Sequence, residues 1–446
     1  MKYAREGSLI DMVVALAAFP RTALPDRARR LAGLSLLDWM ACGLAAVDEP
    51  LAIKLRRLIG DEAGRGVASV LGGRAAPARA AALVNGATSH ALDYDDTHFA
   101  HIGHLSVGIY PAALAAGEER GATATQVVDA FLLGAESAIR IGLVLGSAHY
   151  NLGFHQTATA GAFGATVAAG RLYGLDEGQM RAALGLCATR ASGLKSQFGT
   201  MGKPYNAGIA ASNGVECAAL AALGMSSADD GLMGVQGFVP THSPKPDASA
   251  GLMPPPEEAF LFGDNKYKLH ACCHGTHAMI EAIIGSEDLK GSDLGNVAGL
   301  EVRANPRWLR VCDLKTPRTG LEVKFSYAWL AGMAIRGDRT GDDGIYTNET
   351  ASDTALADFA GKVTVTGDDR LSDMQAGLTV TLRDGTRLEL AHDLDAVLPE
   401  QMLADKLRNK AEALLGTAGQ TLWQRFEDLD GVTARDLGAF LGSRES

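Results

Sequence analysis

Residues 90–104 read HALDYDDTHFAHIGH and place four histidines and three aspartates in fifteen positions, although the whole chain has only 11 histidines. Imidazole and carboxylate groups can bind a metal ion, transfer protons or form a buried hydrogen-bond network. Metal-site patterns such as HExxH and DxDxDG are absent from the sequence. His104 is the best candidate for proton transfer because imidazole titrates near neutral pH, and Asp93 and Asp96 are candidates for supporting it.

Two further segments place basic side chains where helices are expected to begin. In GFHQTATAGAFGATVAAGRLYGL (153–175), His155 precedes a run of small residues, and a helix N-terminus favours the neutral form of an imidazole. In FGTMGKP (198–204), Lys203 can bind a carboxylate as a point charge or, if desolvated, act as a base. Considered singly, a packed histidine and a surface lysine are the simpler interpretations.

Two later segments carry additional candidates. KYKLHACCHGTHAMIEAI (266–283) brings Lys268 and Cys273 close to an expected helix start, and KTPRTGLEVKFSYAWLAG (315–332) brings Tyr327 close to a turn. Charged and aromatic residues at such positions are usually solvated or packed, so neither segment alone indicates a site.

Most of the elements that must position these residues are expected to be helices. From residue 9 to about 235, apolar residues recur at three- and four-residue spacing, and several segments are apolar almost all round, which predicts buried helices. The clearest of these segments cover residues 26–46, 107–119, 125–145 and 177–192. A stretch rich in Pro, Ser and Gly (239–258) predicts a connecting loop.

Alternation with period two appears only later in the chain. It predicts strands at 296–305, 361–368 and 377–390, and the Asp-Gly pair at 384–385 predicts a hairpin turn within the last of them. Helical patterns cover 274–286 and 322–337, and they return from 399 onward. The sequence therefore predicts a mainly α protein: a large all-α domain (1–264), an inserted smaller α+β domain (265–398), and C-terminal helices (399–446) that rejoin the first domain.

The bulk composition excludes several classes of protein. The 446-residue chain has a formal net charge of -11 and no run of Lys and Arg, which argues against broad binding to nucleic acid or anionic membranes. It shows neither a secretory signal pattern nor a stretch of about 20 apolar residues, so we expect a cytoplasmic protein. The six cysteines lack CxxC spacing and are expected to be reduced.

The candidate segments, in their order along the chain, resemble the MmgE/PrpD family, whose members include 2-methylcitrate dehydratase, cis-aconitate decarboxylase and iminodisuccinate epimerase. The resemblance covers about residues 80 to 330. It is carried by His104 and by NGATSHALDYDDTH (85–98), GFHQTATAGAFGATVAAGRLYGL (153–175), FGTMGKP (198–204), KLHACCHGTHA (268–278) and PRTGLEVKFS (317–326).

This resemblance implies a homodimer whose large all-α domain is covered by the smaller α+β domain as a lid, with the active site between them and with no metal or organic cofactor. It also implies a substrate that is a small di- or tricarboxylate. The catalytic positions that it indicates are His104, His155, Asp93 and Lys203, and the substrate-binding positions are Thr97, Lys268, Asn206, Cys273 and Tyr327.

The chemistry that the resemblance implies is removal of a proton from the carbon next to a carboxylate. Under this hypothesis His104 and His155 act as base and acid on opposite faces of that carbon, and Asp93 orients His104. Lys203 and Lys268 would hold the substrate carboxylates, with a hydrogen bond from Thr97. Return of a proton on the other face gives epimerisation, whereas loss of a β-hydroxyl as water gives an alkene.

Differences from the decarboxylase members favour a dehydratase or an epimerase. Those members have a histidine where this chain has Cys273 and a tyrosine near Trp329, and they tend to read KPLH where this chain reads KPYN, with Asn206. Both of the first two changes remove a group that can carry a proton.

Two alternatives stay open on the sequence alone. A metal-dependent hydrolase would use the Asp/His cluster at 93–104, with Asp95, Asp96, His98 and His101 as ligands. A helical dimer without catalytic activity would use the same helices for interaction only.

Overall fold

The computed structural model describes residues 8–289 and 291–442, and these residues form two compact units. The first unit contains the described residues up to Tyr267 together with those from Thr417 onward, and the second contains those from Lys268 to Gly416. The fold is mainly α, as the sequence predicts.

The first unit is built from helices and one short β-hairpin. The hairpin is a departure from the predicted all-α domain, and Gly72, with φ +63°, lies in its turn. The bounds of its elements are α1 Leu9–Ala17, α2 Asp26–Ala45, α3 Pro50–Leu58, β1 Ala68–Val70, β2 Gly73–Ala76, α4 Ala78–Ser89, α5 Ser106–Arg120, α6 Ala124–Leu152, α7 Thr159–Tyr173, α8 Glu177–Ala188, α9 Gly202–Ala222, α10 Phe238–His242, α11 Ala248–Leu252, α19 Thr417–Phe426 and α20 Ala434–Leu441.

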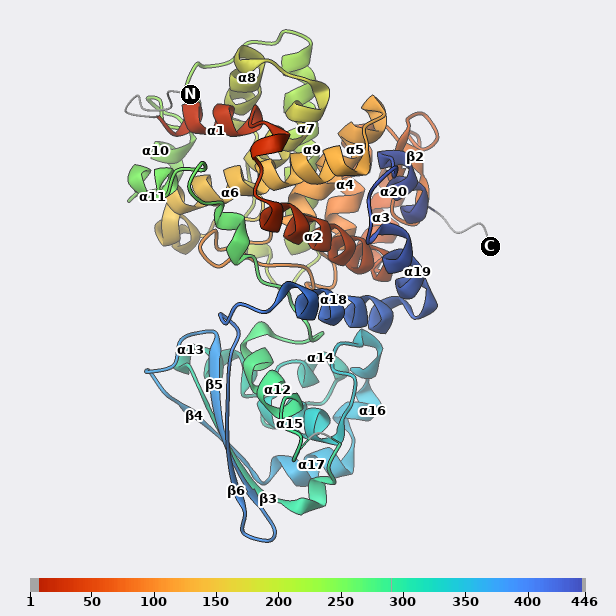
Figure 1. The fold of residues 1–446 in the computed structure, drawn as a ribbon, viewed down its shortest axis with the longest axis vertical. Helices are drawn as coiled ribbons and strands as arrows, with labels where there is room; N and C mark the ends of the chain where they lie inside the picture. The colour runs from red at the N-terminus through yellow and green to blue at the C-terminus, as the bar shows by residue number, and fades with distance from the viewer. Residues whose placement is uncertain (1–7, 290, 443–446) are drawn as a thin grey trace. The chain divides into compact units, whose positions relative to one another are not determined.

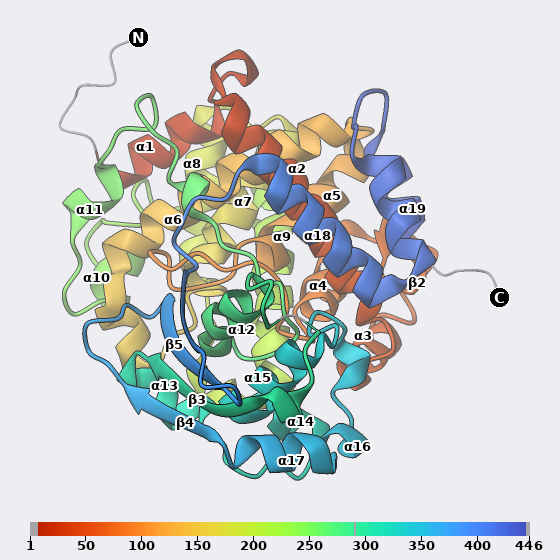
Figure 2. The same ribbon diagram turned by 60° about the horizontal axis from the view of Figure 1, so that its bottom comes forward.

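Four helices of this unit, α6, α7, α9 and α4, lie side by side in that order (Figure 2). Glycines allow their close approach. A Cβ atom on Gly134 of α6 would lie 2.4 Å from the carbonyl oxygen of Gly164 on α7, and one on Gly208 of α9 would lie 2.3 Å from that of Leu83 on α4. The Gly- and Ala-rich composition is therefore used to bring helix backbones together.

The segment at 239–258 is less irregular than the sequence suggests, because it contains the short helices α10 and α11. The buried side chain of Arg140 on α6 organises its end. The guanidinium donates to the carbonyls of Gly251, Pro254 and Ala259, and it forms an ion pair with Glu136 at 2.8 Å. The stretch is thus bound to the first unit by hydrogen bonds from one buried cation.

The C-terminal helices α19 and α20 return to the first unit (Figure 1). The helix α20 lies beside β1. The buried carboxyl group of Glu118 on α5 accepts hydrogen bonds from the backbone N–H and the hydroxyl of Ser69 on β1. Gly438 of α20 passes so close that a Cβ atom there would lie 2.0 Å from Glu118 Oε1. A glycine is therefore needed where the last helix crosses this carboxyl group.

The second unit contains a four-stranded sheet in the order β4-β3-β5-β6, with α12 and α15 on one face (Figure 1). β3 pairs with β4 in parallel and with β5 antiparallel, and β5 and β6 form the hairpin predicted from the Asp-Gly pair. The element bounds are α12 His277–Ile284, β3 Val297–Ala304, α13 Pro306–Cys312, α14 Gly320–Val323, α15 Tyr327–Arg336, α16 Asn348–Ala351, α17 Thr354–Ala360, β4 Val363–Gly367, β5 Gln375–Leu382, β6 Arg387–Asp393 and α18 Glu400–Leu415.

The helix α18 belongs to the second unit, so the chain leaves this unit after Gly416 and not after residue 398 as the sequence-based division has it. Lys406 of α18 forms an ion pair of 2.7 Å with Glu281 of α12, and His270 lies 3.2 Å from the same carboxylate. The helical pattern from 399 was correctly predicted, but periodicity does not indicate the partner of a helix. The other boundary lies at 267, three residues beyond the predicted 264.

The helix expected at 322–337 is interrupted. The structure has α14 and α15 there, separated by three residues, and the Ser326 hydroxyl accepts a hydrogen bond from the backbone N–H of Trp329 at the start of α15. Serine at an N-cap supplies an acceptor for an otherwise unpaired N–H group. The break therefore has a local chemical cause.

Among the residues that the structure describes, no single helix has both the length and the apolar character needed to cross a membrane. The pair α2 and α3, bent by 90° at their junction, meets that criterion when the two are counted together, by length and composition alone.

Candidate active site

The loop between α4 and α5 carries the histidines and aspartates noted in the sequence. Thr97 pairs with Lys266 through two backbone hydrogen bonds of 2.8 Å, and His98 pairs with Gly103 in a second short antiparallel bridge. Asp93 adopts φ +52°, a left-handed conformation in which Asp is more common than most residues. These turns fold the loop back on itself and bring residues from both of its ends together.

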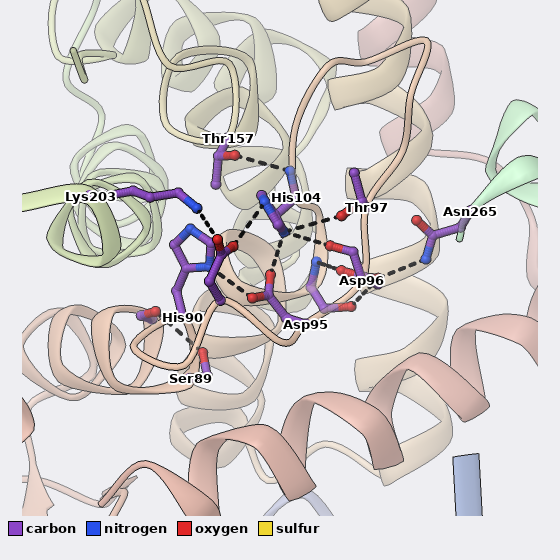
Figure 3. A network of polar contacts seen from close by, with 12 residues as sticks. Ser89, His90, Asp95, Asp96, Thr97, His104, Thr157, Lys203 and Asn265 are labelled. Atoms are coloured by element: carbon purple, nitrogen blue, oxygen red, sulfur yellow. Dashed lines mark hydrogen bonds and ion pairs between the residues drawn. The ribbon is translucent and has the colours of Figure 1, made fainter. Parts of the chain in front are cut away.

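Asp95 lies between two imidazoles at the centre of this loop (Figure 3). Its Oδ1 is 2.8 Å from Nδ1 of His90, and its Oδ2 is 2.8 Å from Nδ1 of His104. Burial by itself would raise the pKa of Asp95, but the two imidazoles together hold it well below the usual range. Asp95 is therefore a buried carboxylate that contacts both histidines.

Asp93 and Lys203 lie on the other side of His104. The Lys203 ammonium on α9 is 2.7 Å from Asp93 Oδ2, while Asp93 Oδ1 is 3.6 Å from Nε2 of His104. The side chain of Asp93 is 48% exposed and that of Lys203 is 17% exposed, so solvent reaches this ion pair. We call His90, Asp93, Asp95, His104 and Lys203 the His/Asp/Lys cluster.

Asp96 stabilises the loop through hydrogen bonds with Ser106 and Asn265. Its carboxyl group accepts hydrogen bonds from the backbone and hydroxyl of Ser106 and from the amide of Asn265, at 2.6 to 3.0 Å, and its backbone carbonyl lies 2.7 Å from Nδ1 of His104. Burial raises the pKa of Asp96 in spite of these donors. The backbone N–H of His104 donates to the Thr157 hydroxyl at 3.0 Å (Figure 3), which holds the main chain at His104 against the segment before α7.

His155 and Asn206 form a second buried group next to the cluster. His155 is 2% exposed and Asn206 is 4% exposed, and the Asn206 amide nitrogen lies 3.2 Å from Nδ1 of His155. The ring of Phe198 meets His155 edge-on at a centroid distance of 5.0 Å, and Lys203 Nζ lies 5.4 Å from the centroid of the same ring. Phe198 thus provides an apolar surface beside both residues.

The structure places the remaining candidates of the first unit as follows. The Thr97 hydroxyl lies 3.5 Å from Nδ1 of His104, at the edge of the cluster. His98 Nε2 is 3.0 Å from the carbonyl oxygen of Leu261, and His101 Nδ1 is 3.1 Å from that of Ala138. Burial lowers the pKa of His101 to about 3. His98 and His101 therefore anchor the loop to the backbone and are not brought together with the cluster.

Three candidates belong to the second unit. Lys268 is 8% exposed, and Cys273 is half-buried at the start of a short 3-10 turn. Tyr327 is fully buried, and its hydroxyl donates to the carbonyl of Gly275 at 2.8 Å. Their assignment to the substrate site stays a prediction from the family resemblance.

Sequence reasoning did not single out His90, and it considered Asp95 only as a metal ligand. His90 is the residue that ends α4, and the five-residue spacing to Asp95 spans the turn that brings their side chains together. Asp93 was expected to orient His104, but the carboxylate at the Nδ1 side of that imidazole is Asp95. The sequence shows which residues HALDYDD contains, but which of their side chains contact each other depends on the conformation of the loop.

The cluster also offers the donor set of a cation site. One nitrogen or oxygen atom from each of His90, Asp93, Asp95 and His104 lies within 4.8 Å of the others. The Lys203 ammonium, which contacts Asp93, already neutralises one of these carboxylates and would repel a divalent cation. The same charge is well suited to an anionic substrate.

The fold and the site define a mainly α protein with a partly solvent-accessible group of imidazoles, carboxylates and one ammonium. The MmgE/PrpD N-terminal domain model matches residues 11–250, and the MmgE/PrpD C-terminal domain model matches residues 270–433. The chain belongs to the MmgE/PrpD family.

Curated relatives are similar over part of their length. The chain is 33% identical over 287 residues to a cis-aconitate decarboxylase of Aspergillus terreus, which covers 60% of this chain and 57% of the relative. It is 30% identical over 272 residues to the cis-aconitate decarboxylase-like protein oryM of Aspergillus oryzae, with 56% and 55% covered. For the human cis-aconitate decarboxylase the identity is 30% over 177 residues, with 38% and 37% covered. The chain thus matches little more than half the length of the first two.

Proposed function

We propose that this protein is a cofactor-independent acid/base enzyme that removes a proton α to a carboxylate of a small di- or tricarboxylate. The observation that carries the proposal is the arrangement around His104, which has a carboxylate at its Nδ1 side and an ammonium–carboxylate pair at its Nε2 side. Such a reaction needs a base and a positive charge that stabilises the enediolate formed when the proton leaves.

His104 is the base in this proposal. Its Nδ1 lies against acceptors, so the imidazole can accept a proton at Nε2. When it does, Asp95 stabilises the imidazolium from its Nδ1 side. This arrangement uses a buried carboxylate in the way that serine hydrolases use their aspartate: to hold an imidazole in one orientation and to stabilise its charged form.

Lys203 binds a carboxylate of the substrate in this proposal. The ammonium is paired with Asp93, whose side chain is half exposed and can be displaced from it. A substrate carboxylate that takes the place of Asp93 would lie beside His104 Nε2, since Asp93 itself lies 3.6 Å from that atom. Lys203 therefore supports both the affinity for a carboxylate and the position of its α-carbon next to the base. Thr97 and the second-unit residue Lys268 are proposed as further substrate contacts, on the resemblance.

The product is proposed to be an epimer or an alkene. Cys273 and Trp329 replace a histidine and a tyrosine of the decarboxylase members, and this difference supports an epimerase or dehydratase type. The curated relatives are named as cis-aconitate decarboxylases, so decarboxylation belongs among the reactions to be tested.

The proposal is tested by a proton-exchange screen. The purified protein is incubated in deuterated water with citrate, methylcitrate, aconitate and N-linked succinates, and ¹H NMR follows the α-protons. Loss of the α-proton signal of at least one carboxylate is expected, whether or not a new product forms. No exchange and no turnover for any member of the panel would contradict the proposal and would favour the non-catalytic helical dimer.

A second candidate function, that of a metal-dependent hydrolase, is supported by the four possible ligand atoms that lie within 4.8 Å of one another in the His/Asp/Lys cluster. Metal analysis of the purified protein separates the two. Stoichiometric metal, together with an activity that a chelator removes and the metal restores, would favour the hydrolase. The acid/base proposal predicts an exchange rate that a chelator leaves unchanged.

A further inference from the structure

The tautomer of His104 follows from the atoms around its Nδ1. The carbonyl oxygen of Asp96 lies 2.7 Å from this nitrogen, and Oδ2 of Asp95 lies 2.8 Å from it. Both oxygens can only accept hydrogen bonds when Asp95 is ionised, so Nδ1 must carry a proton. In the neutral ring Nε2 then has a free lone pair, which is the form that a base requires.

The tautomer of His155 follows in the same way and is the opposite one. The Asn206 amide nitrogen lies 3.3 Å from the carbonyl oxygen of Leu194, and this acceptor fixes which end of the amide carries the hydrogens. The same nitrogen lies 3.2 Å from Nδ1 of His155 and donates to it. Because Nδ1 accepts, the neutral His155 ring carries its proton on Nε2.

The surroundings of His155 disfavour a positive charge. The side chain is almost fully buried, and the charged or titratable groups that face it are His90 and His104 from the cluster loop, Lys203 from α9, and Asp93. Burial, followed by His90, His104 and Lys203, lowers the pKa of His155 to about 2, and Asp93 opposes them only in part.

We propose that Asn206 is a positioning residue that holds His155 as a neutral Nε2–H donor, so that His155 hydrogen-bonds the developing oxyanion and does not transfer a proton. This inference rests on the proposed function, and it differs from the role of acid that the sequence-based hypothesis gives to His155. A neutral imidazole that gave up its Nε2 proton would become an imidazolate, which is too unstable to form in this step. Hydrogen-bond donors fixed in advance toward a developing negative charge are among the largest contributors to catalysis.

The electron and proton balance of the step is then defined. His104 Nε2 takes the α-proton, and the electron pair of the C–H bond moves into the carboxylate to give an enediolate, whose oxygen accepts a hydrogen bond from His155. The proton that returns to carbon, or that leaves with a β-hydroxyl, comes from the imidazolium of His104 or from the ammonium of Lys203. Asn206, predicted from the sequence to contact substrate, acts through His155 instead.

The first test is NMR of the wild-type protein labelled with ¹⁵N-histidine, with signals assigned by single His→Gln variants. We expect His104 to show a protonated Nδ1 and an unprotonated Nε2, and His155 to show the reverse. We also expect the His155 signals not to titrate between pH 5 and 8. A His155 ring protonated at Nδ1, or one that titrates in this range, would overturn the inference without any substituted protein.

The second test is Asn206→Asp, which replaces the donor at Nδ1 of His155 by an acceptor. We expect His155 to change to the Nδ1–H form and the α-proton exchange rate to fall about 100-fold, the usual cost of losing one oxyanion donor. The matched control is Asn213→Asp on the same helix, since Asn213 is equally buried and contacts Arg190. This control should leave both the His155 signals and the exchange rate unchanged. An Asn206→Asp protein with wild-type tautomers and rate would overturn the role of Asn206.

Failure of this inference can be distinguished from failure of the proposed function. If no carboxylate exchanges its α-proton, the proposed function fails whatever the tautomers are. If exchange occurs but His155 is protonated at Nδ1, the proposed function stands and the inference about Asn206 and His155 fails.

Discussion

Asp93 is the residue of the cluster whose position is easiest to change. Its backbone has φ +52°, its carboxylate is half exposed, and it contacts Lys203 on one side and approaches Nε2 of His104 on the other. A bound anion can therefore take over Lys203 without uncovering a buried charge. In contrast, Asp95 is fully buried and holds its two histidines in place whether or not a substrate is present.

Lys203→Gln tests the carboxylate contact. We expect KM to rise about 10- to 100-fold, because a hydrogen bond to a charged group contributes about 1.5–3 kcal/mol. The matched control is Lys195→Gln, which removes a lysine whose Nζ donates to the Tyr150 carbonyl outside the cluster. Steady-state kinetics on the substrate found by the exchange screen would measure both. An unchanged KM for Lys203→Gln would contradict the contact.

For single residues, the sequence predicted which residues belong to the site better than it predicted which side chains contact each other. His104, Asp93 and Lys203 were selected from their chemistry and from the family resemblance, and the structure brings all three together. The pairing of His90 with Asp95, and of His155 with Asn206, depends on how a loop turns and how α9 faces it. No spacing rule predicts such contacts between side chains that come from different elements.

At the scale of elements, the close contact of α4 and α9 sets the separation of the two sides of the cluster. The helix α4 ends at Ser89, directly before His90, and α9 carries Lys203 and Asn206 in its first two turns. Gly208 lies two residues beyond Asn206 on α9, where a Cβ atom would lie 2.3 Å from the backbone of Leu83. A larger residue at Gly208 must therefore push the two helices apart.

Gly208→Ala should destabilise the protein by about 1–3 kcal/mol, the usual cost of overpacking. It should also lower the exchange rate, because the two helices carry opposite sides of the site. The control is Gly33→Ala on α2, where nothing lies within 4 Å of the added Cβ atom. That substitution should be neutral or stabilise by up to about 1 kcal/mol. Urea unfolding measures both, and equal stability of the two variants would contradict the packing argument.

The existence of these elements was largely predictable, but their ends and breaks were less so. The hairpin of β5 and β6 follows from period-two alternation and an Asp-Gly turn. The break before α15 depends on the capping hydroxyl of Ser326, and the extension of α6 to Leu152 crosses a kink at Gly146. Such features depend on a single residue, whereas the spacing of apolar residues is read over many positions and does not predict them.

In the whole molecule, Glu118 lies where the C-terminal helix α20 packs against the rest of the first unit. Its buried carboxyl group lies between Ser69 of β1 and Gly438 of α20. Burial raises the pKa of Glu118 to about 7, in spite of the hydrogen bonds from Ser69. Because the pKa is higher in the folded than in the unfolded protein, this group stabilises the fold fully below about pH 4.5, and that contribution is lost as the pH rises through 7.

Glu118→Gln should therefore lose part of the pH dependence of stability. Between pH 5 and pH 8 the free energy of unfolding of the wild type should fall by up to about 3 kcal/mol more than that of the variant, at about 1.4 kcal/mol per pKa unit. Glu119→Gln, at the exposed neighbouring position, is the control and should keep the wild-type pH dependence. Urea unfolding at both pH values measures these free energies. An equal change in the free energy of unfolding between the two pH values for Glu118→Gln and the wild type would contradict the assignment to Glu118.

Sequence reasoning predicted a mainly α protein with a later α+β part, because the two periodicities occupy different stretches of the chain. In the structure α18 belongs to the second unit, where Lys406 pairs with Glu281 of α12, and periodicity alone does not indicate which unit a helix joins. The homodimer and the lid role of the second unit stay predictions from the family resemblance. Measurement of the mass in solution tests the first of them.

The proposed role of His104, removal of an α-proton, is tested by the exchange rate of His104→Gln. The variant is compared with the wild type and with His242→Gln, a histidine of α10 outside the cluster, after unfolding curves have established that all three proteins are folded. We expect exchange to fall by about 10²- to 10⁴-fold in His104→Gln alone. A folded His104→Gln protein that exchanges the α-proton at the wild-type rate would contradict it.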